Sequence, residues 1–198
     1  MSEDPRLDEL AEALRAGEVV AVPTDTVYGL AARPDSPAAT ARVFELKGRP
    51  DALALPVLVA GLDQALSLAA PPHRPLEALA RAFWPGALTV VVRRSRGVEL
   101  AVGGDAATVG LRCPDDPGVR RLCELVGPLA VTSANRHGEP PCTSPAEVRA
   151  AFGAIALLDG GQRAGEPSSV VSIVEGRPVE LRRGPIPLDA IEAVLASA

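Results

Sequence analysis

The chain has 198 residues, of which 47% are hydrophobic, 3% aromatic and 23% charged, and its formal net charge is -5. This length suits one domain with a sizeable core, and so few aromatic residues mean that the core must consist mainly of Ala, Val and Leu. The acidic balance argues against a protein devoted to coating nucleic acid, because phosphate backbones attract clustered Lys and Arg.

The sequence predicts neither a membrane segment, a signal peptide, a disulfide framework nor a structural zinc site. No apolar run is long enough to span a bilayer, and the acidic start does not resemble a signal peptide, so we expect no membrane contact. The three cysteines form no C-x-x-C pair, which favours a reducing cytoplasm over a disulfide framework. His73 and His137 lie far apart without a ligand pattern around them, so no structural zinc site is expected.

The first elements alternate between helix and strand. Residues 5–16 carry apolar side chains at helical spacing and are predicted to form a helix that Gly17 ends. The apolar run 19–23 predicts a buried strand. Ser36 then suits the N-cap of a second helix, which is predicted to run to Lys47.

The rest of the chain continues this alternation. Further strands are predicted over 55–60, 88–92, 108–112, 129–133, 155–159, 169–174 and 178–182, and further helices over 62–69, 75–83, 117–126, 144–152 and 187–196. Ser144 with Glu147 three residues later is close to a capping box at the start of one of these helices. Because no repeat or linker interrupts the pattern, residues 1–198 are predicted to form a single α/β domain.

Lys47 is the one lysine in a chain with 19 arginines. Such a bias suggests that lysine survives where a compact ammonium is needed and a planar guanidinium will not serve, although chance survival is the alternative. The neighbours of Lys47 do not form a P-loop, and no G-x-G-x-x-G follows a predicted strand. A nucleotide would therefore have to be bound in another way.

Polar side chains collect at the ends of several predicted strands. They are Thr24, Asp25, Thr26, Tyr28, Thr108, Arg112, Thr132, Ser133, Asn135, Ser168, Ser169 and Arg182. Ligands of open α/β sheets favour the crevice beyond strand ends, so convergence of these residues predicts a site rich in hydroxyls and cations that suits an anionic ligand. Each segment alone also fits an ordinary turn, helix cap or surface arginine.

Several segments together resemble the YrdC/Sua5 family. They are PTDTVYGL (23–30), KGRP (47–50), WPGALT (84–89), TVGLRCP (108–114), VTSAN (131–135), and the late SSVVSI and LRRGPI. The resemblance covers about residues 7–186 and looks like the short bacterial type without an additional C-terminal domain. It implies a twisted open mixed sheet flanked by helices.

The family comprises threonylcarbamoyl-AMP synthases, which are nucleotidyltransferases that start the t6A modification of tRNA. The resemblance implies L-threonine, bicarbonate and ATP with Mg²⁺ as reactants, and threonylcarbamoyl-adenylate and pyrophosphate as products. The adenylate would pass to the tRNA threonylcarbamoyltransferase machinery, and a weak direct contact with tRNA is left open. Such chemistry needs mainly positioning and cations near phosphates, which the residues above supply.

The resemblance also implies residue roles. For L-threonine it implies Thr26, Arg112 and Ser168; for ATP it implies Lys47, Arg49, Thr108, Ser133, Asn135 and Arg182. Lys47 and Arg49 are the catalytic candidates because they would bind the phosphates, and Asn135 would brace the Ser133 loop. No protein metal ligand and no general base is assigned.

Three positions depart from the family pattern. Leu53 stands where a polar residue is usual, so one ligand contact is missing or replaced, and Ser172 and His137 stand where Asp and Ser are common. Two other functions remain open: a non-catalytic tRNA-binding module, and carbamoyl-adenylate-type transfer to a different acceptor. Threonine-dependent release of pyrophosphate would distinguish them.

Overall fold

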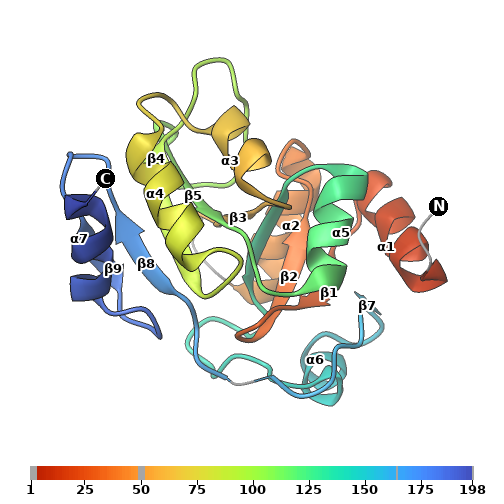
Figure 1. Ribbon diagram of the computed structural model, residues 1–198. Coiled ribbons are helices and arrows are strands. Elements are labelled where there is room, and N and C mark those ends of the chain that lie inside the picture. Colours follow the sequence, from red (N-terminus) through yellow and green to blue (C-terminus); the bar gives the residue numbers. More distant parts are fainter. Residues whose placement is uncertain (1–3, 49–51, 164, 198) are drawn as a thin grey trace.

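A computed structural model describes residues 4–48, 52–163 and 165–197 (Figure 1). Its helices are α1 (Pro5–Arg15), α2 (Pro37–Lys47), α3 (Leu62–Leu68), α4 (Arg74–Phe83), α5 (Pro117–Val126), α6 (Pro145–Phe152) and α7 (Leu188–Ala196). Its strands are β1 (Val20–Pro23), β2 (Tyr28–Ala32), β3 (Val57–Leu58), β4 (Leu88–Arg93), β5 (Thr108–Arg112), β6 (Leu129–Ser133), β7 (Ala156–Leu157), β8 (Ser169–Ser172) and β9 (Val179–Arg182).

Within the described residues the strands form one nine-stranded sheet in the order β7-β1-β2-β6-β3-β5-β4-β8-β9. Three neighbouring pairs are parallel (β1 with β7, β3 with β5, β4 with β8) and the others are antiparallel. The predicted α/β fold with a mixed sheet flanked by helices is confirmed. In the described ranges no helix has both the length and the apolar character needed to cross a bilayer.

Helix α2 ends where the sequence predicts. The Ser36 hydroxyl accepts a hydrogen bond from the Ala39 amide at 3.4 Å, and Pro37 occupies the first helical position. Gly48 follows the helix in the left-handed conformation with φ of 61°, which glycine adopts without strain. These two signals place Lys47 on the last helical residue.

Strand β2 is absent from the prediction. Its sequence, YGLAA, contains one glycine and two alanines, which have low strand propensity, so periodicity did not indicate it. The strand exists because β1 and β6 pair with its two edges. A Cβ at Gly29 would lie 2.5 Å from the Val131 Cγ1, so glycine permits this close approach of β6.

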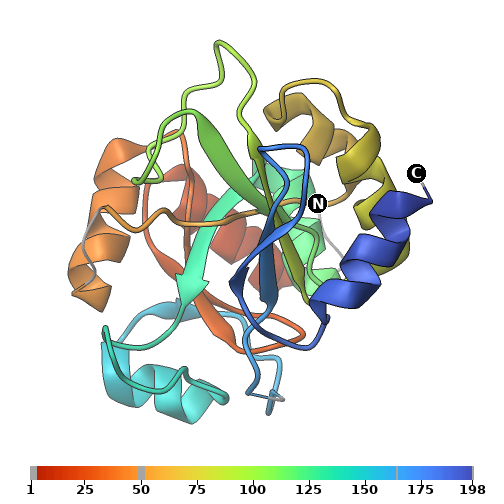
Figure 2. The ribbon, with the colours of Figure 1, turned by 90° about the vertical axis from the view of Figure 1, so that its left-hand side faces the viewer.

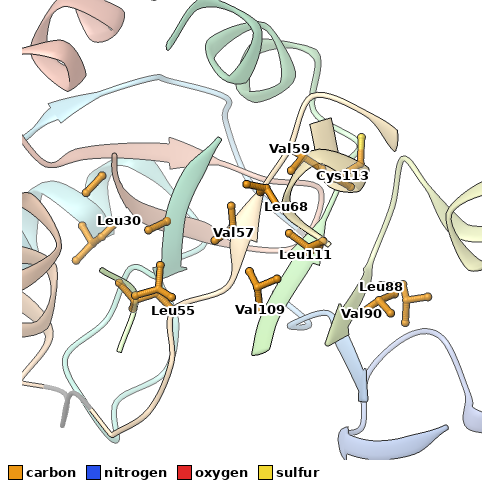
Figure 3. Packing of buried hydrophobic residues seen from close by; sticks show 14 of the residues in the cluster. Leu30, Leu55, Val57, Val59, Leu68, Leu88, Val90, Val109, Leu111 and Cys113 are labelled. Atoms are coloured by element: carbon orange, nitrogen blue, oxygen red, sulfur yellow. The ribbon is translucent and has the colours of Figure 1, made fainter. Parts of the chain in front are cut away.

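The two faces of the sheet carry separate hydrophobic clusters. Side chains of α2, α3, α4, α6 and α7 pack on one face, whereas α1 and α5 pack together against β1, β2 and β6 on the other. In Figure 2, α2 (orange) lies at the left of the sheet, and α4 and α7 lie together at the right. Figure 3 shows the first cluster, into which Val109 and Leu111 of β5 and Leu88 and Val90 of β4 project.

Candidate functional site

A pocket of about 480 Å³ lies over the face of the sheet that α1 and α5 cover only in part. Alternate residues of the central strands form its floor: Thr108, Gly110 and Arg112 on β5, and Thr89 and Val91 on β4. Their sequence neighbours point into the core on the opposite face, because successive side chains of a strand alternate. The volume falls within the range of about 300–1,000 Å³ typical of small-molecule sites.

This placement corrects one expectation. Residues at strand ends do reach the pocket, but so do residues in the middle of β4 and β5, so the site is not confined to the crevice beyond the strand ends. The reason is that the helices of this face, α1 and α5, pack on β1, β2 and β6. The hydrophobic cluster beneath them ends at Leu58 and Val131, which also line the pocket.

The pocket brings together six of the nine residues that the resemblance implies. They are Thr26, Thr108, Arg112, Ser133, Ser168 and Arg182. Lys47 and Asn135 are not among the lining residues and instead contact Ser133. Arg49 lies outside the described residues.

Arg112 sits in a ring of acceptors at the end of β5. Its Nε donates to the Gly86 carbonyl at 2.9 Å, its Nη1 to the Thr26 hydroxyl at 3.2 Å, and its Nη2 to the Asp25 carboxylate at 2.7 Å. Asp25 also accepts a hydrogen bond from the backbone amide of Asp115 at 3.1 Å. The guanidinium is therefore fixed by the turn that holds Asp25 and Thr26 and by the segment that holds Gly86.

The electrostatics of this ring follow from burial. Arg112 is only 6% exposed, and removal from water lowers the pKa of its guanidinium, while the Asp25 carboxylate opposes that shift. A buried cation of this kind requires a partner, and the 2.7 Å pair with Asp25 provides one. The result is a fixed positive group in the pocket wall, suited to a carboxylate or phosphate.

The Thr24-Asp25-Thr26 turn has a defined hydroxyl order. The Thr24 hydroxyl donates to the Val27 carbonyl at 2.7 Å, so its 2.9 Å contact with the Thr26 hydroxyl must use the Thr26 proton. Thr26 consequently accepts from Arg112 and donates to Thr24. Both threonines line the pocket and both are buried.

A second polar group connects β4, β8 and β9. The Ser168 hydroxyl lies 3.0 Å from the Thr89 hydroxyl and accepts from the Arg182 Nη2 at 2.9 Å. Arg182 Nε also donates to the Ser168 carbonyl at 2.9 Å. This double contact positions the Arg182 guanidinium at the pocket wall, beside a buried serine.

A third group surrounds the buried Lys47. Its ammonium contacts the Ser133 carbonyl at 2.8 Å, the Ser133 hydroxyl at 3.1 Å and the Asn135 side-chain oxygen at 2.5 Å. The Ser133 hydroxyl donates to the same Asn135 oxygen at 2.7 Å. Asn135 thus contacts the Ser133 loop in the way a bracing residue would, and Lys47 holds both residues at the end of β6.

The positions that depart from the family pattern fall in different places. Leu53 lines the pocket and is 45% exposed. His137 is exposed, and its backbone amide donates to the Lys47 carbonyl at 2.7 Å. Ser172 lies on β8 and is not a lining residue, so of the three positions only Leu53 lines the pocket.

Sequence reasoning gave no role to Asp25 or Thr89. Asp25 belongs to the segment PTDTVYGL, but its partner Arg112 is 87 positions away, so sequence spacing does not reveal the pair. Thr89 carried a usable signal, since it is the one polar residue in the apolar run LTVVV, where a buried hydroxyl needs a hydrogen-bond partner.

The described residues hold no group of three or more His, Cys, Asp or Glu side chains placed to bind a metal ion. Among the described residues that line the pocket, Asp105 is the one acidic residue. Mg²⁺ commonly binds through substrate phosphates and water with few protein carboxylates. This donor set therefore fits a magnesium ion that arrives with a polyphosphate.

Comparisons with known proteins show which family this chain is similar to. A family model described as Telomere recombination, the Sua5/YciO/YrdC domain, matches residues 12–184. The threonylcarbamoyl-AMP synthase of Pyrococcus abyssi is 41% identical over 186 residues, covering 92% of this chain, and that of Chromohalobacter salexigens is 42% identical over 161 residues, covering 78%. This chain spans 55% of the Pyrococcus relative and 85% of the Chromohalobacter relative.

A solved structure shows the same fold. The crystal structure of Pyrococcus abyssi Sua5 complexed with L-threonine superposes with a TM-score of 0.89 at 39% identity. The match covers 95% of this chain and 56% of that one.

Proposed function

The chain belongs to the Sua5/YciO/YrdC family, and from that premise we propose that it is a threonylcarbamoyl-AMP synthase. The proposed reaction joins L-threonine, bicarbonate and ATP into threonylcarbamoyl-adenylate and pyrophosphate for the t6A modification of tRNA. The observation that carries the proposal is the pocket in which Arg112, Arg182 and the hydroxyls of Thr26, Ser133 and Ser168 meet. Two relatives with this activity in their names support it.

The proposed reaction forms a C–N bond and then an O–P bond. The threonine amine attacks CO2 derived from bicarbonate and loses a proton to give a carbamate. A carbamate oxygen then attacks the α-phosphorus of ATP. The bond from this phosphorus to the bridging oxygen breaks, and pyrophosphate leaves. Mg²⁺, when bound with ATP, neutralises charge on the phosphates. The protein must mainly align two anionic reactants and stabilise the charge that develops on the leaving group.

Different residues of the pocket can bind the two anionic reactants. Arg112 and Thr26 are proposed to bind the threonine carboxylate, because this guanidinium is fixed by Asp25 and Gly86 and offers its remaining N–H groups to an anion. Ser168 would lie close by as a hydroxyl partner.

The nucleotide is proposed to occupy the adjoining part of the pocket, where Arg182 lies beside Ser168. Thr108, Ser133 and Arg182 would contact it, and Lys47 and Arg49 remain the proposed phosphate-binding residues. In support of this, the Lys47 ammonium contacts Ser133, which itself lines the pocket. A bound phosphate would replace the oxygens of Ser133 and Asn135 as hydrogen-bond partners of the Lys47 ammonium. We further propose that the adenylate passes to the tRNA threonylcarbamoyltransferase machinery.

The test is pyrophosphate release in the presence of ATP, Mg²⁺ and bicarbonate, with and without L-threonine. We expect threonine-dependent release, and an Arg112→Met variant should lose about 10- to 100-fold in kcat/KM, the size of one lost charged hydrogen bond. Arg33→Met is the matched control, because Arg33 pairs with Asp35 at the surface and does not line the pocket.

Other outcomes would contradict the proposal. Release that depends on a different amine would instead favour transfer to another acceptor. Tight tRNA binding without any release of pyrophosphate would favour a non-catalytic tRNA-binding module.

A further inference from the structure

Large hydrophobic side chains that are exposed to solvent are rare in this molecule and concentrate at the pocket. Among the described residues they are Leu53, Val179 and Leu181, which are 45%, 38% and 58% exposed. Leu53 and Leu181 both line the pocket, whereas Val179 does not. Exposed apolar side chains at the edge of a ligand pocket suggest that a ligand covers them.

A backbone irregularity places Leu181 there. In a regular strand Leu181 and Arg182 would face opposite sides of the sheet, yet both line the pocket. The β8–β9 register explains this, because Val170 pairs with Arg182 and Val171 pairs with Glu180, which leaves Leu181 without a partner across the strand. This β-bulge directs an apolar and a cationic side chain to the same site.

The rest of the pocket wall is mixed, and its polar groups narrow the choice of occupant. Buried hydroxyls and the two arginines can bind carboxylate and phosphate groups, so a ligand that also covers two leucines must combine an anionic part with an extended apolar surface. Threonine offers one methyl group, whereas the purine of a nucleotide offers two flat faces. The purine is therefore the better match.

We propose that Leu53 and Leu181 form an apolar rim that packs against the adenine base of the bound nucleotide. This inference rests on the proposed function, since it takes ATP as a ligand. It gives Leu53 a role at a position where the family pattern usually has a polar residue: an apolar contact with the base replaces a polar one.

The experiment compares the affinity of two ligands that share phosphates and differ in the base. ATP and inorganic triphosphate are titrated calorimetrically, without threonine, into the full chain and into Leu53→Ser, Leu181→Ser and the double variant. Covering about half of a leucine side chain corresponds to an affinity change of about fivefold. We expect each single variant to bind ATP about fivefold more weakly and the double variant about 25-fold more weakly.

Triphosphate affinity should stay within about twofold in all variants. Val179→Ser is the matched control, being an exposed apolar residue of the same strand outside the pocket, and should bind both ligands like the unmodified chain. Because all three side chains are exposed, these substitutions should not unfold the protein. Thermal melts would verify this.

Equal losses for ATP and triphosphate, or unchanged ATP affinity in the double variant, would overturn the apolar rim while leaving the proposed function intact. A chain that binds neither ligand and releases no pyrophosphate with threonine would overturn the proposed function, and the rim with it.

Discussion

Removal of the Asp25 carboxylate is the strongest test of the ion pair that fixes Arg112. Asp25→Ala leaves a guanidinium that is 6% exposed with two neutral acceptors, the Gly86 carbonyl and the Thr26 hydroxyl. Breaking a buried pair from one side costs about 3–5 kcal/mol, and the 17% exposure of the Asp25 side chain places the expected loss near the lower end, about 3 kcal/mol. Urea unfolding at neutral pH measures it.

The matched control is Asp35→Ala, which removes the partner of Arg33. That pair is exposed, at 32% and 56%, so its loss should cost no more than about 1 kcal/mol. A second check is Asp25→Ala combined with Arg112→Met, which should be more stable than Asp25→Ala alone because no unpaired charge remains. Similar losses for the two alanine variants, or a double variant less stable than Asp25→Ala, would refute the reasoning.

Three further changes test other parts of the molecule. Lys47→Arg should lower kcat/KM at least about 100-fold, because a planar guanidinium does not fit the compact place of the ammonium beside Ser133 and Asn135. The far-UV circular dichroism spectrum should stay unchanged, and normal turnover would contradict the prediction. Gly110→Leu should weaken ATP binding at least about tenfold, because the leucine side chain fills the pocket. Gly110→Ala should bind ATP nearly normally in calorimetry, because its Cβ would lie no closer than 3.5 Å to its neighbours. Loss of binding in both variants would point to a general disturbance of β5 instead. Burial raises the pKa of the Cys123 thiol well above its ordinary value, so the folded state keeps the thiol protonated, and the stability that this contributes is lost as pH rises above about 9. In urea unfolding, the free energy of unfolding of Cys123→Ala should therefore decline less steeply with pH, by up to about 1.4 kcal/mol per pH unit. Equal slopes for the variant and the unmodified chain would contradict this.

The sequence predicts features that depend on nearby residues. Helix α2 is an example, since Ser36 and Gly48 signal both of its ends within the segment itself. The contact between Ser133 and Asn135 was also within reach, because the two residues are only two positions apart.

Features that depend on the order of strands were beyond prediction from sequence. Ser168 meets Thr89 because β8 runs parallel to β4 with Leu88 opposite Ser169, and no local pattern reports that register. Strand β2 likewise depends on partners on both sides rather than on its own glycine and alanines. The pair of Asp25 and Arg112 arises only once the sheet has formed.

Strand β9 lies at the end of the sheet, and the bulge at Leu181 has a consequence there beyond ligand binding. An open edge with regular backbone donors and acceptors can pair with another chain, and exposed apolar residues such as Val179 increase that tendency. The bulge interrupts the regular edge, and the charged Glu180 and Arg182 flank it. The same extra residue that directs Leu181 to the pocket therefore also protects this edge against aggregation.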